Sequence, residues 1–300
     1  MFSVGSVVVF IARTYRERLF IKKILNRFLE LLEGSYDLSR RLNIYRLPGL
    51  SFREYLLFSN HLEIAPISFK KLVLDPWAFS ELGQIDKVLG HFKKYLEVGY
   101  YPFIFEAQET YYERVSAIIN KIIYEDIPNC FDLKTANLHL FKKLLGYLAS
   151  IPPGEVNSNS IARSIGIAHQ TVENYLHILA SVGLVNMIFP SEGGGQYLRK
   201  PAKIFIYNTT LLHTLQSYLG TGINKGNLRE LFFLQALRDA NQNAFYSKQG
   251  DYRVENHLFE IGGKNKTGKQ IQDTEGLLVK DDILVPSKNV IPLFYFGFLT

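Results

Sequence analysis

The feature that most constrains the fold of this chain is a glycine that interrupts a helical pattern between residues 158 and 181. Gly166 is expected to end a first helix and to permit a tight turn into a second helix, from about residue 168 to 181. Ala162 is small where the two helices must cross closely. The second helix has apolar residues at i, i+3, i+4 and i+7, which are Val172, Tyr175, Leu176 and Leu179. The pattern predicts a helix-turn-helix with this face packed inward.

A hairpin is predicted directly after the second helix. Residues 185–189 and 203–207 have the composition of strands, and Gly193, Gly194 and Gly195 between them are expected at the hairpin tip. With one more helix predicted from about residue 133, residues 136–210 are predicted to form a winged helix-turn-helix. The alternative is a helical hairpin that packs on a neighbouring domain.

The face of the second helix opposite the apolar one carries the candidates for contact with nucleic acid. Side chains of these types hydrogen-bond base edges and phosphates. The net charge of +6, from 34 Lys and Arg against 28 Asp and Glu, permits phosphate binding without requiring it. Three basic residues of the wing favour contact with nucleic acid, and two of them, Arg199 and Lys200, are expected to meet phosphates, while Lys203 adds to the basic character of the wing. The candidates are Gln170, Thr171, Asn174 and His177 on the helix and Arg199 and Lys200 on the wing.

The cysteine content and the N-terminal residues indicate the cellular compartment. Cys130 is the single cysteine of the sequence, so a disulfide within the chain and a cysteine-based zinc cluster are both excluded. The apolar run at residues 7–11 is too short to span a bilayer and lacks the features of a signal peptide. We therefore expect a cytoplasmic protein without a membrane partner, with a strand over residues 1–12 and a basic helix over 13–33.

The remaining patterns predict helices followed by a mixed sheet. Ser51 and Glu54 form a capping-box signature, and Pro128 is expected to end a helix that begins near Glu109. After residue 211 a helical region precedes five strands. The predicted class is therefore α/β. The strands are expected near residues 244–247, 252–255, 258–261, 277–279 and 291–298.

Several strings occur in this chain in the order and spacing of one protein family. On these strings the chain resembles prokaryotic AAA-type ATP-binding proteins with a C-terminal domain of unknown function, from about residue 29 to the end. The resemblance includes the helix-turn-helix. The other strings are 37–41 (DLSRR), 47–56 (LPGLSFREYL), 119–128 (INKIIYEDIP), 198–208 (LRKPAKIFIYN), 226–232 (GNLRELF) and 259–264 (FEIGGK).

The resemblance implies an ATPase domain with a phosphate-binding loop, ATP and Mg²⁺ as cofactors, and action in an oligomer. The phosphate-binding loop is not recognisable, so we expect a truncated member, a decayed gene, or a gene whose start lies upstream. This chain is expected to have no cofactor of its own and not to hydrolyse ATP alone. Arg40 and Arg41 lie where such proteins can reach a phosphate across a subunit interface. The expected parts are an ATPase remnant with a helical lid (1–135), the winged helix (136–210) and a nuclease-like α/β domain (211–300).

The last of these parts is, by the same resemblance, similar to restriction-endonuclease-like folds. That similarity implies a magnesium site formed by Glu230, Asp251 and Glu260, with a lysine nearby. Alternate residues of a strand share a face, yet position 262 is glycine, so Lys264 would have to fold back. For this reason we expect no DNA cleavage.

One loop near this site has a sequence similar to a nucleotide-binding motif. Residues 263–270 nearly fit a phosphate-binding loop but end in Gln270, which lacks the hydroxyl that binds magnesium. A solvated basic loop is therefore expected there.

Three hypotheses on function follow. The first is a DNA-binding protein that is not catalytic alone, the second an ATP-binding subunit of an oligomer, and the third a metal-dependent nuclease. The expected partners are DNA, further copies of the chain, or an intact ATPase subunit.

Overall fold

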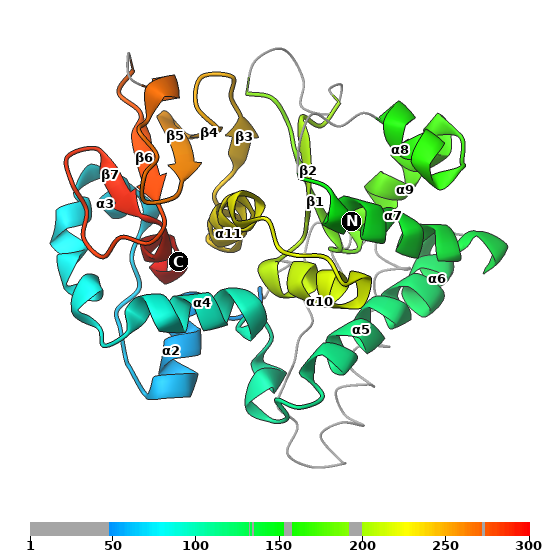
Figure 1. Cartoon of the computed structure of the whole chain (residues 1–300), viewed down its shortest axis with the longest axis horizontal. Coiled ribbons are helices and arrows are strands. Elements are labelled where there is room, and N and C mark those ends of the chain that lie inside the picture. The colour runs from blue at the N-terminus through cyan, green and yellow to red at the C-terminus, as the bar shows by residue number, and fades with distance from the viewer. Residues whose placement is uncertain (1–47, 132, 134, 153–157, 192–199, 272–273) are drawn as a thin grey trace, which may run out of the picture. The chain divides into compact units, whose positions relative to one another are not determined.

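The computed structural model describes residues 48–131, 133, 135–152, 158–191, 200–271 and 274–300 (Figure 1). The described residues from Gly49 to Thr300 belong to one compact unit. The strand predicted for 1–12, the helix predicted for 13–33, Arg40, Arg41 and Arg199 lie outside the described residues. Among the described residues, no helix has the length and apolar character needed to cross a membrane.

Short helices occupy the first described part of the chain. They are α2 (Phe52–Asn60), α3 (Phe69–Leu74), the 3-10 helix η1 (Pro76–Gln84), α4 (Val88–Val98) and the 3-10 helix η2 (Pro102–Phe105). The predicted capping box is confirmed, since the Glu54 amide donates to Ser51 Oγ at 3.2 Å and the Ser51 amide donates to Glu54 Oε2 at 2.9 Å. Two backbone donors at the start of α2 are satisfied in this way.

The helix expected to end at Pro128 instead continues through it. α5 (Tyr111–Lys121) passes into a π-helical turn (Ile122–Asp126) and then into α6 (Ile127–Phe131). Proline inside an α-helix clashes with the carbonyl four residues earlier and lacks an amide donor. In the wider π-helical turn, the Ile127 amide donates to the Ile122 carbonyl, five residues earlier. This bond lies directly before Pro128. The prediction was wrong because it allowed only a regular α-helix.

The next elements are the ones predicted from the glycine pattern. A 3-10 turn (η4, Thr135–Asn137) precedes α7 (His139–Ser150), α8 (Ser158–Ile165) and α9 (His169–Ser181). β1 (Val185–Ile188) and β2 (Lys203–Ile206) then pair antiparallel, with Val185 opposite Ile206. Gly166 adopts a φ of +78°, which glycine tolerates at no steric cost, so the predicted stop of α8 is confirmed.

The final part contains two helices and a mixed five-stranded sheet. α10 (Thr209–Leu219) and α11 (Lys225–Asp239) are followed by β3 (Ala244–Tyr246), β4 (Tyr252–Val254), β5 (His257–Gly262), the 3-10 helix η6 (Lys269–Ile271), β6 (Leu277–Lys280) and β7 (Val290–Pro292). The strand order is β3-β4-β5-β6-β7, antiparallel through β5 and parallel from β5 to β7. The expected α/β class with a mixed sheet is confirmed.

The last predicted strand is only partly correct. Residues 291–298 were expected to be extended, but β7 ends at Pro292 and Leu293–Phe298 form the 3-10 helix η7. All six residues of η7 are buried. A continuous apolar run of this length fits a buried helical turn as well as a strand, so periodicity alone cannot separate them.

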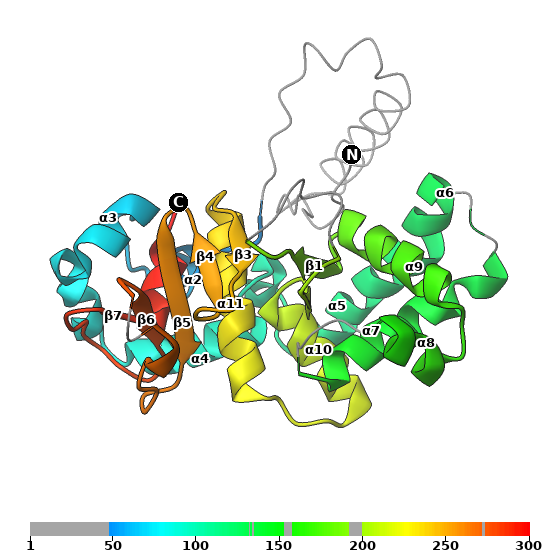
Figure 2. The same cartoon turned by 90° about the horizontal axis from the view of Figure 1, so that it is seen from above.

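The N-terminal helices and the sheet share one core. The ring of Phe92 in α4 packs on that of Phe232 in α11 with centroids 4.7 Å apart, and Phe52 in α2 lies 5.5 Å from Phe298 in η7. On the sheet itself, Phe233 packs on Phe259 at 5.3 Å. Figures 1 and 2 show the sheet on one side of α10, α11 and the β1–β2 hairpin, and α5 to α9 on the other.

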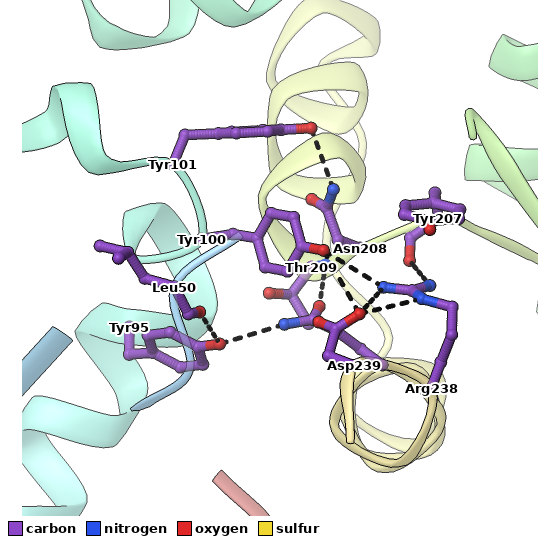
Figure 3. Close-up of polar contacts among 10 residues, drawn as sticks. Leu50, Tyr95, Tyr100, Tyr101, Tyr207, Asn208, Thr209, Arg238 and Asp239 are labelled. Atoms are coloured by element: carbon purple, nitrogen blue, oxygen red, sulfur yellow. Dashed lines mark hydrogen bonds and ion pairs between the residues drawn. The ribbon is translucent and has the colours of Figure 1, made fainter. Parts of the chain in front are cut away.

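Buried polar groups fix the region where α10, α11 and the end of α4 meet (Figure 3). Arg238 donates to Asp239 at 2.8 Å and to the Tyr207 carbonyl at 2.6 Å. Gln235 donates to Tyr95 Oη at 3.2 Å, and its own oxygen accepts from the Thr209 amide at 2.9 Å. Burial raises the pKa of Asp239, against the opposing effect of Arg238. These bonds satisfy polar groups that would otherwise be costly to bury.

Candidate nucleic-acid interface and carboxylate group

The two faces of α9 differ as the sequence predicted. Val172, Tyr175, Leu176 and Leu179 are all buried. On the other face Gln170, Asn174 and His177 are exposed, and Thr171 is half-buried. The structure therefore brings these four polar candidates onto one accessible helix surface.

Packing on α7 and α8 holds α9 in place. The ring of Tyr175 stacks on Phe141 of α7, with centroids 4.2 Å apart and 23° between the planes. Ile161 and Ala162 of α8 are buried, and the Ala162 carbonyl accepts from the amides of Gly166 (2.9 Å) and Ile167 (3.1 Å). The orientation of the polar face is thus set by side-chain packing and by the glycine turn.

A shallow, open depression lies at this turn, and it contains a basic side chain, Arg163, that was not among the predicted candidates. Arg163 of α8 is exposed, and its Nε donates to the Asn159 carbonyl at 3.4 Å. His169 at the start of α9 lies 3.2 Å from Glu173. Arg163 supplies the basic side chain that the exposed face of α9 lacks, and its position three residues before Gly166 was the available signal. The depression is lined by Asn159, Ala162, Arg163, Gly166, Ile167, Ala168 and His169.

The described wing lysines have different surroundings. Lys200 is exposed, as a phosphate contact requires. Lys203 also favoured nucleic-acid contact as a basic residue of the wing, but its side chain is only 14% exposed and its Nζ lies 2.7 Å from Glu230 Oε2. A lysine at the start of a wing strand can face either side, and Lys203 faces α11.

Glu230 therefore belongs to a closed set of contacts. Besides Lys203, the hydroxyl of Tyr252 donates to the same carboxylate oxygen. The Lys203 ammonium lies 5.1 Å from the ring centroid of Tyr252 and 5.5 Å from that of Tyr246. These contacts satisfy Oε2 of Glu230 with protein groups.

Asp251 precedes β4, and its side chain bonds to the backbone of the neighbouring strand β5. Its Oδ2 accepts from the Ile261 amide at 2.7 Å. Burial raises the pKa of Asp251, and the charge of Glu230 adds to this effect, whereas the Ile261 amide, Lys203 and Lys266 lower it. A carboxylate that is costly to ionise in the folded state is a candidate for a functional group.

Glu260 is the most buried of the three carboxylates predicted to bind metal. Its side chain is 1% exposed, and its Oε1 lies 3.0 Å from Nζ of Lys266. The other oxygen, Oε2, is buried and has no hydrogen-bond partner among the described residues. Lys264, which would have to fold back to reach Glu260, is exposed. The loop at 263–270 is therefore not fully solvated, since Lys266 turns inward.

The surroundings of the three carboxylates bear on the predicted magnesium site. Within the described ranges, no three His, Cys, Asp or Glu side chains lie together in a way that would hold a metal ion. Lys203 and the Tyr252 hydroxyl both contact Oε2 of Glu230, so that oxygen is not available as a ligand. Glu260 fits a ligand role, because a buried carboxylate oxygen without a partner accommodates a cation. The three-residue site stays a prediction.

Comparison with known proteins adds relatives without an assigned function. Residues 89–225 match a family model described as a domain of unknown function (DUF8612). The uncharacterized protein MJ1637 of Methanocaldococcus jannaschii is 26% identical over 89% of this chain and 62% of its own length. An uncharacterized protein of Haemophilus influenzae is 26% identical over 76% of this chain and 59% of its own length. The chain thus spans about three fifths of these relatives. No solved structure is significantly similar to it.

Proposed function

We propose that this chain binds duplex nucleic acid through the exposed face of α9, in a winged helix-turn-helix formed by α7, α8, α9 and the β1–β2 hairpin. The observation that supports this most directly is the division of α9 into a fully buried apolar face and a polar face that carries Gln170, Asn174 and His177. Amide and imidazole side chains on one helix surface suit hydrogen bonding to base edges in a major groove.

Basic side chains flank this surface and support the same proposal. Arg163 lies beside the start of α9, and Lys200 is exposed just before β2. Contacts between cations and phosphates position a protein on the duplex, whereas base contacts give sequence preference. We therefore expect variants of the basic residues to change the affinity for all sequences, and variants of the polar α9 residues to change the sequence preference.

The test is fluorescence anisotropy on a labelled duplex across a salt series. Replacing Arg163 and Lys200 with alanine should weaken binding to all sequences and reduce the salt slope by about 2, since each phosphate contact releases about one counterion. Asn174→Ala should change sequence preference by about 1–3 kcal/mol. Asn129→Ala, on the exposed side of α6, is the matched control. Absence of binding at low salt would assign α9 to protein packing instead.

A second candidate function is cleavage of phosphodiester bonds with a divalent cation. It is favoured by Glu260, which is buried with one unpartnered oxygen and has an ammonium group 3.0 Å from the other. Glu260 and Asp251 are the residues that would hold the cation, which when bound polarises a phosphoryl oxygen and activates water. No cleavage was expected because position 262 is glycine and not lysine. Lys266 supplies an ammonium group beside Glu260 instead, which is why cleavage is kept as a candidate function.

This candidate is tested with supercoiled plasmid and single-stranded DNA in Mg²⁺ or Mn²⁺. Cleavage should be lost in Glu260→Gln and retained in Glu275→Gln, an exposed glutamate after the same loop. Cleavage that survives Glu260→Gln would belong to a contaminant or another site. The ATP-binding alternative depends on Arg40 and Arg41, which lie outside the described residues, and it stays a hypothesis.

A further inference from the structure

We infer that Lys266 is the lysine that acts together with Asp251 and Glu260, the two candidate cation ligands. We also infer that Gly262 makes room for it, because glycine has no side chain to occupy that space. The inference rests on the second candidate function, cleavage of phosphodiester bonds. It assigns a positioning residue to that site, in place of the lysine that the sequence lacks at position 262 and of the exposed Lys264.

The geometry begins with the strand. Glu260 and Gly262 are two residues apart in β5, so their Cα–Cβ directions lie on the same face of the sheet. A Cβ built at position 262 would lie 2.5 Å from Cβ and Cγ of Lys266 and 2.8 Å from its Cδ. The stem of Lys266 therefore occupies the space that a side chain at 262 would fill. Its ammonium reaches Glu260 from there, at 3.0 Å.

The loop between them holds this arrangement. The Lys266 amide donates to the Gly263 carbonyl at 2.9 Å, which closes a turn directly after β5. The Asp281 amide donates to the Gly262 carbonyl at 2.9 Å. Farther along, Ile271 packs with Leu258 and Leu278 on the face that carries Glu260. The loop is anchored at both ends, so Lys266 returns to the strand through defined contacts.

The chemistry follows from burial and charge. An ionised carboxylate that is 1% exposed needs an opposite charge nearby, and Lys266 provides it at one oxygen while the other stays without a partner. Lys266 itself is 34% exposed, so a phosphate could approach its ammonium. Lys266 thus orients Glu260 and offers positive charge where negative charge would develop on a phosphate.

Stability measurements test the position of Lys266 independently of cleavage. Gly262→Ala should lower the melting temperature, because its Cβ would lie 2.5 Å from Cβ and Cγ of Lys266, and Lys266→Gly should lower it by removing the charge. The double variant should melt close to Lys266→Gly alone, since glycine at position 266 lacks the Cβ that the added methyl group would contact. Additive losses in the double variant would overturn the inference, because contacting residues are expected to couple.

Cleavage assays test the role. Lys266→Met should lower kcat by about 100-fold with KM nearly unchanged, the size typical of removing one donor to developing charge. Lys266→Arg should restore part of the rate, and Lys264→Met, in the same loop, should cleave as the unaltered chain does. Equal losses in the two methionine variants would overturn the role of Lys266. If the unaltered chain cleaves nothing, the cleavage proposal fails and the melting data alone decide where Lys266 lies.

Discussion

The ammonium of Lys203 lies 2.7 Å from Oε2 of Glu230, so β2 is ion-paired with α11. The hairpin and the five-stranded sheet also meet through their backbones, since the Tyr246 amide donates to the Phe189 carbonyl at 2.8 Å and the Ser191 amide donates to the Tyr246 carbonyl at 2.9 Å. The strand that leaves α9 is therefore attached to the edge of the sheet that carries Asp251 and Glu260. Both candidate sites are thereby held on one connected framework.

Lys203→Met should destabilise the protein by roughly 3 kcal/mol, because it leaves Glu230 as a mostly buried charge without its ion partner. Urea unfolding followed by circular dichroism measures this loss. Combining it with Glu230→Leu should recover part of the stability, since both charges are then removed. A single variant within about 0.5 kcal/mol of the unaltered chain would mean that the pair contributes only as an exposed one does.

Asp251→Asn should stabilise the protein at neutral pH. Burial raises the pKa of Asp251 above its ordinary value of 3.8, so the folded state binds the proton more tightly than the unfolded chain does. The ionised group therefore costs stability above that raised pKa, and the cost disappears as the pH falls through it. Asparagine still accepts from the Ile261 amide.

Melting temperatures of Asp251→Asn between pH 3.5 and 7 test this. We expect a gain of roughly 2–4 °C at pH 7, corresponding to about 1 kcal/mol, and no gain at the acidic end. Asp86→Asn, at a side chain that is 88% exposed, should show no such trend. A loss of stability at pH 7 would indicate that the attraction of Lys203 and Lys266 outweighs the burial of Asp251.

His213 should make the protein sensitive to mild acid. Burial lowers the pKa of His213 below its ordinary value of 6.5, with opposing effects from Glu97, which raises it, and Lys94, which lowers it further. The unfolded chain then binds the proton more readily, so stability is lost as the pH falls below about 6.5. The Nε2 atom is buried and has no partner among the described residues, which agrees with a neutral ring.

The measurement is urea unfolding at pH 7.5 and pH 5.5. His213→Leu should reduce the difference in stability between the two pH values, and His139→Leu, at an exposed ring, should not. An unchanged difference in His213→Leu would place the acid sensitivity elsewhere.

Local signals explain what the sequence predicted correctly. The α8–α9 turn depends on Gly166, the start of α2 on Ser51 and Glu54, and the buried face of α9 on its spacing. Each of these signals involves residues within about two helical turns. The errors at Pro128 and at residues 293–298 arose where a rarer helical geometry was available to the same residues.

The ionic contacts of the candidate sites could not be predicted in the same way. Lys203 and Glu230 are 27 residues apart, and their pairing depends on how the hairpin meets α11. The glycine at position 262 was interpreted as the loss of a lysine. In the structure, Lys266 occupies the space that a side chain at position 262 would fill. Sequence distance carries no information on such contacts, because the path of the intervening loop decides them.

Gly166 offers a way to separate the stability of the helix-turn-helix from its recognition of nucleic acid. Its φ is +78°, and an added Cβ would meet no atom within 4 Å, so only the backbone conformation opposes a side chain there. Gly166→Ala should therefore cost about 1–2 kcal/mol, while the exposed face of α9 stays intact once the unit is folded. Gly166→Asn should cost less, since asparagine tolerates this conformation better.

Gly220→Ala is the matched control, because Gly220 has a φ of +62° and equally open surroundings at the end of α10. Both alanine variants should lose similar stability in urea. At a temperature where both are folded, both should bind duplex DNA within about twofold of the unaltered chain, a difference below about 0.5 kcal/mol. If Gly166→Ala loses binding while folded and Gly220→Ala does not, the turn itself contacts the nucleic acid, and the interface extends from α9 into the depression beside Arg163.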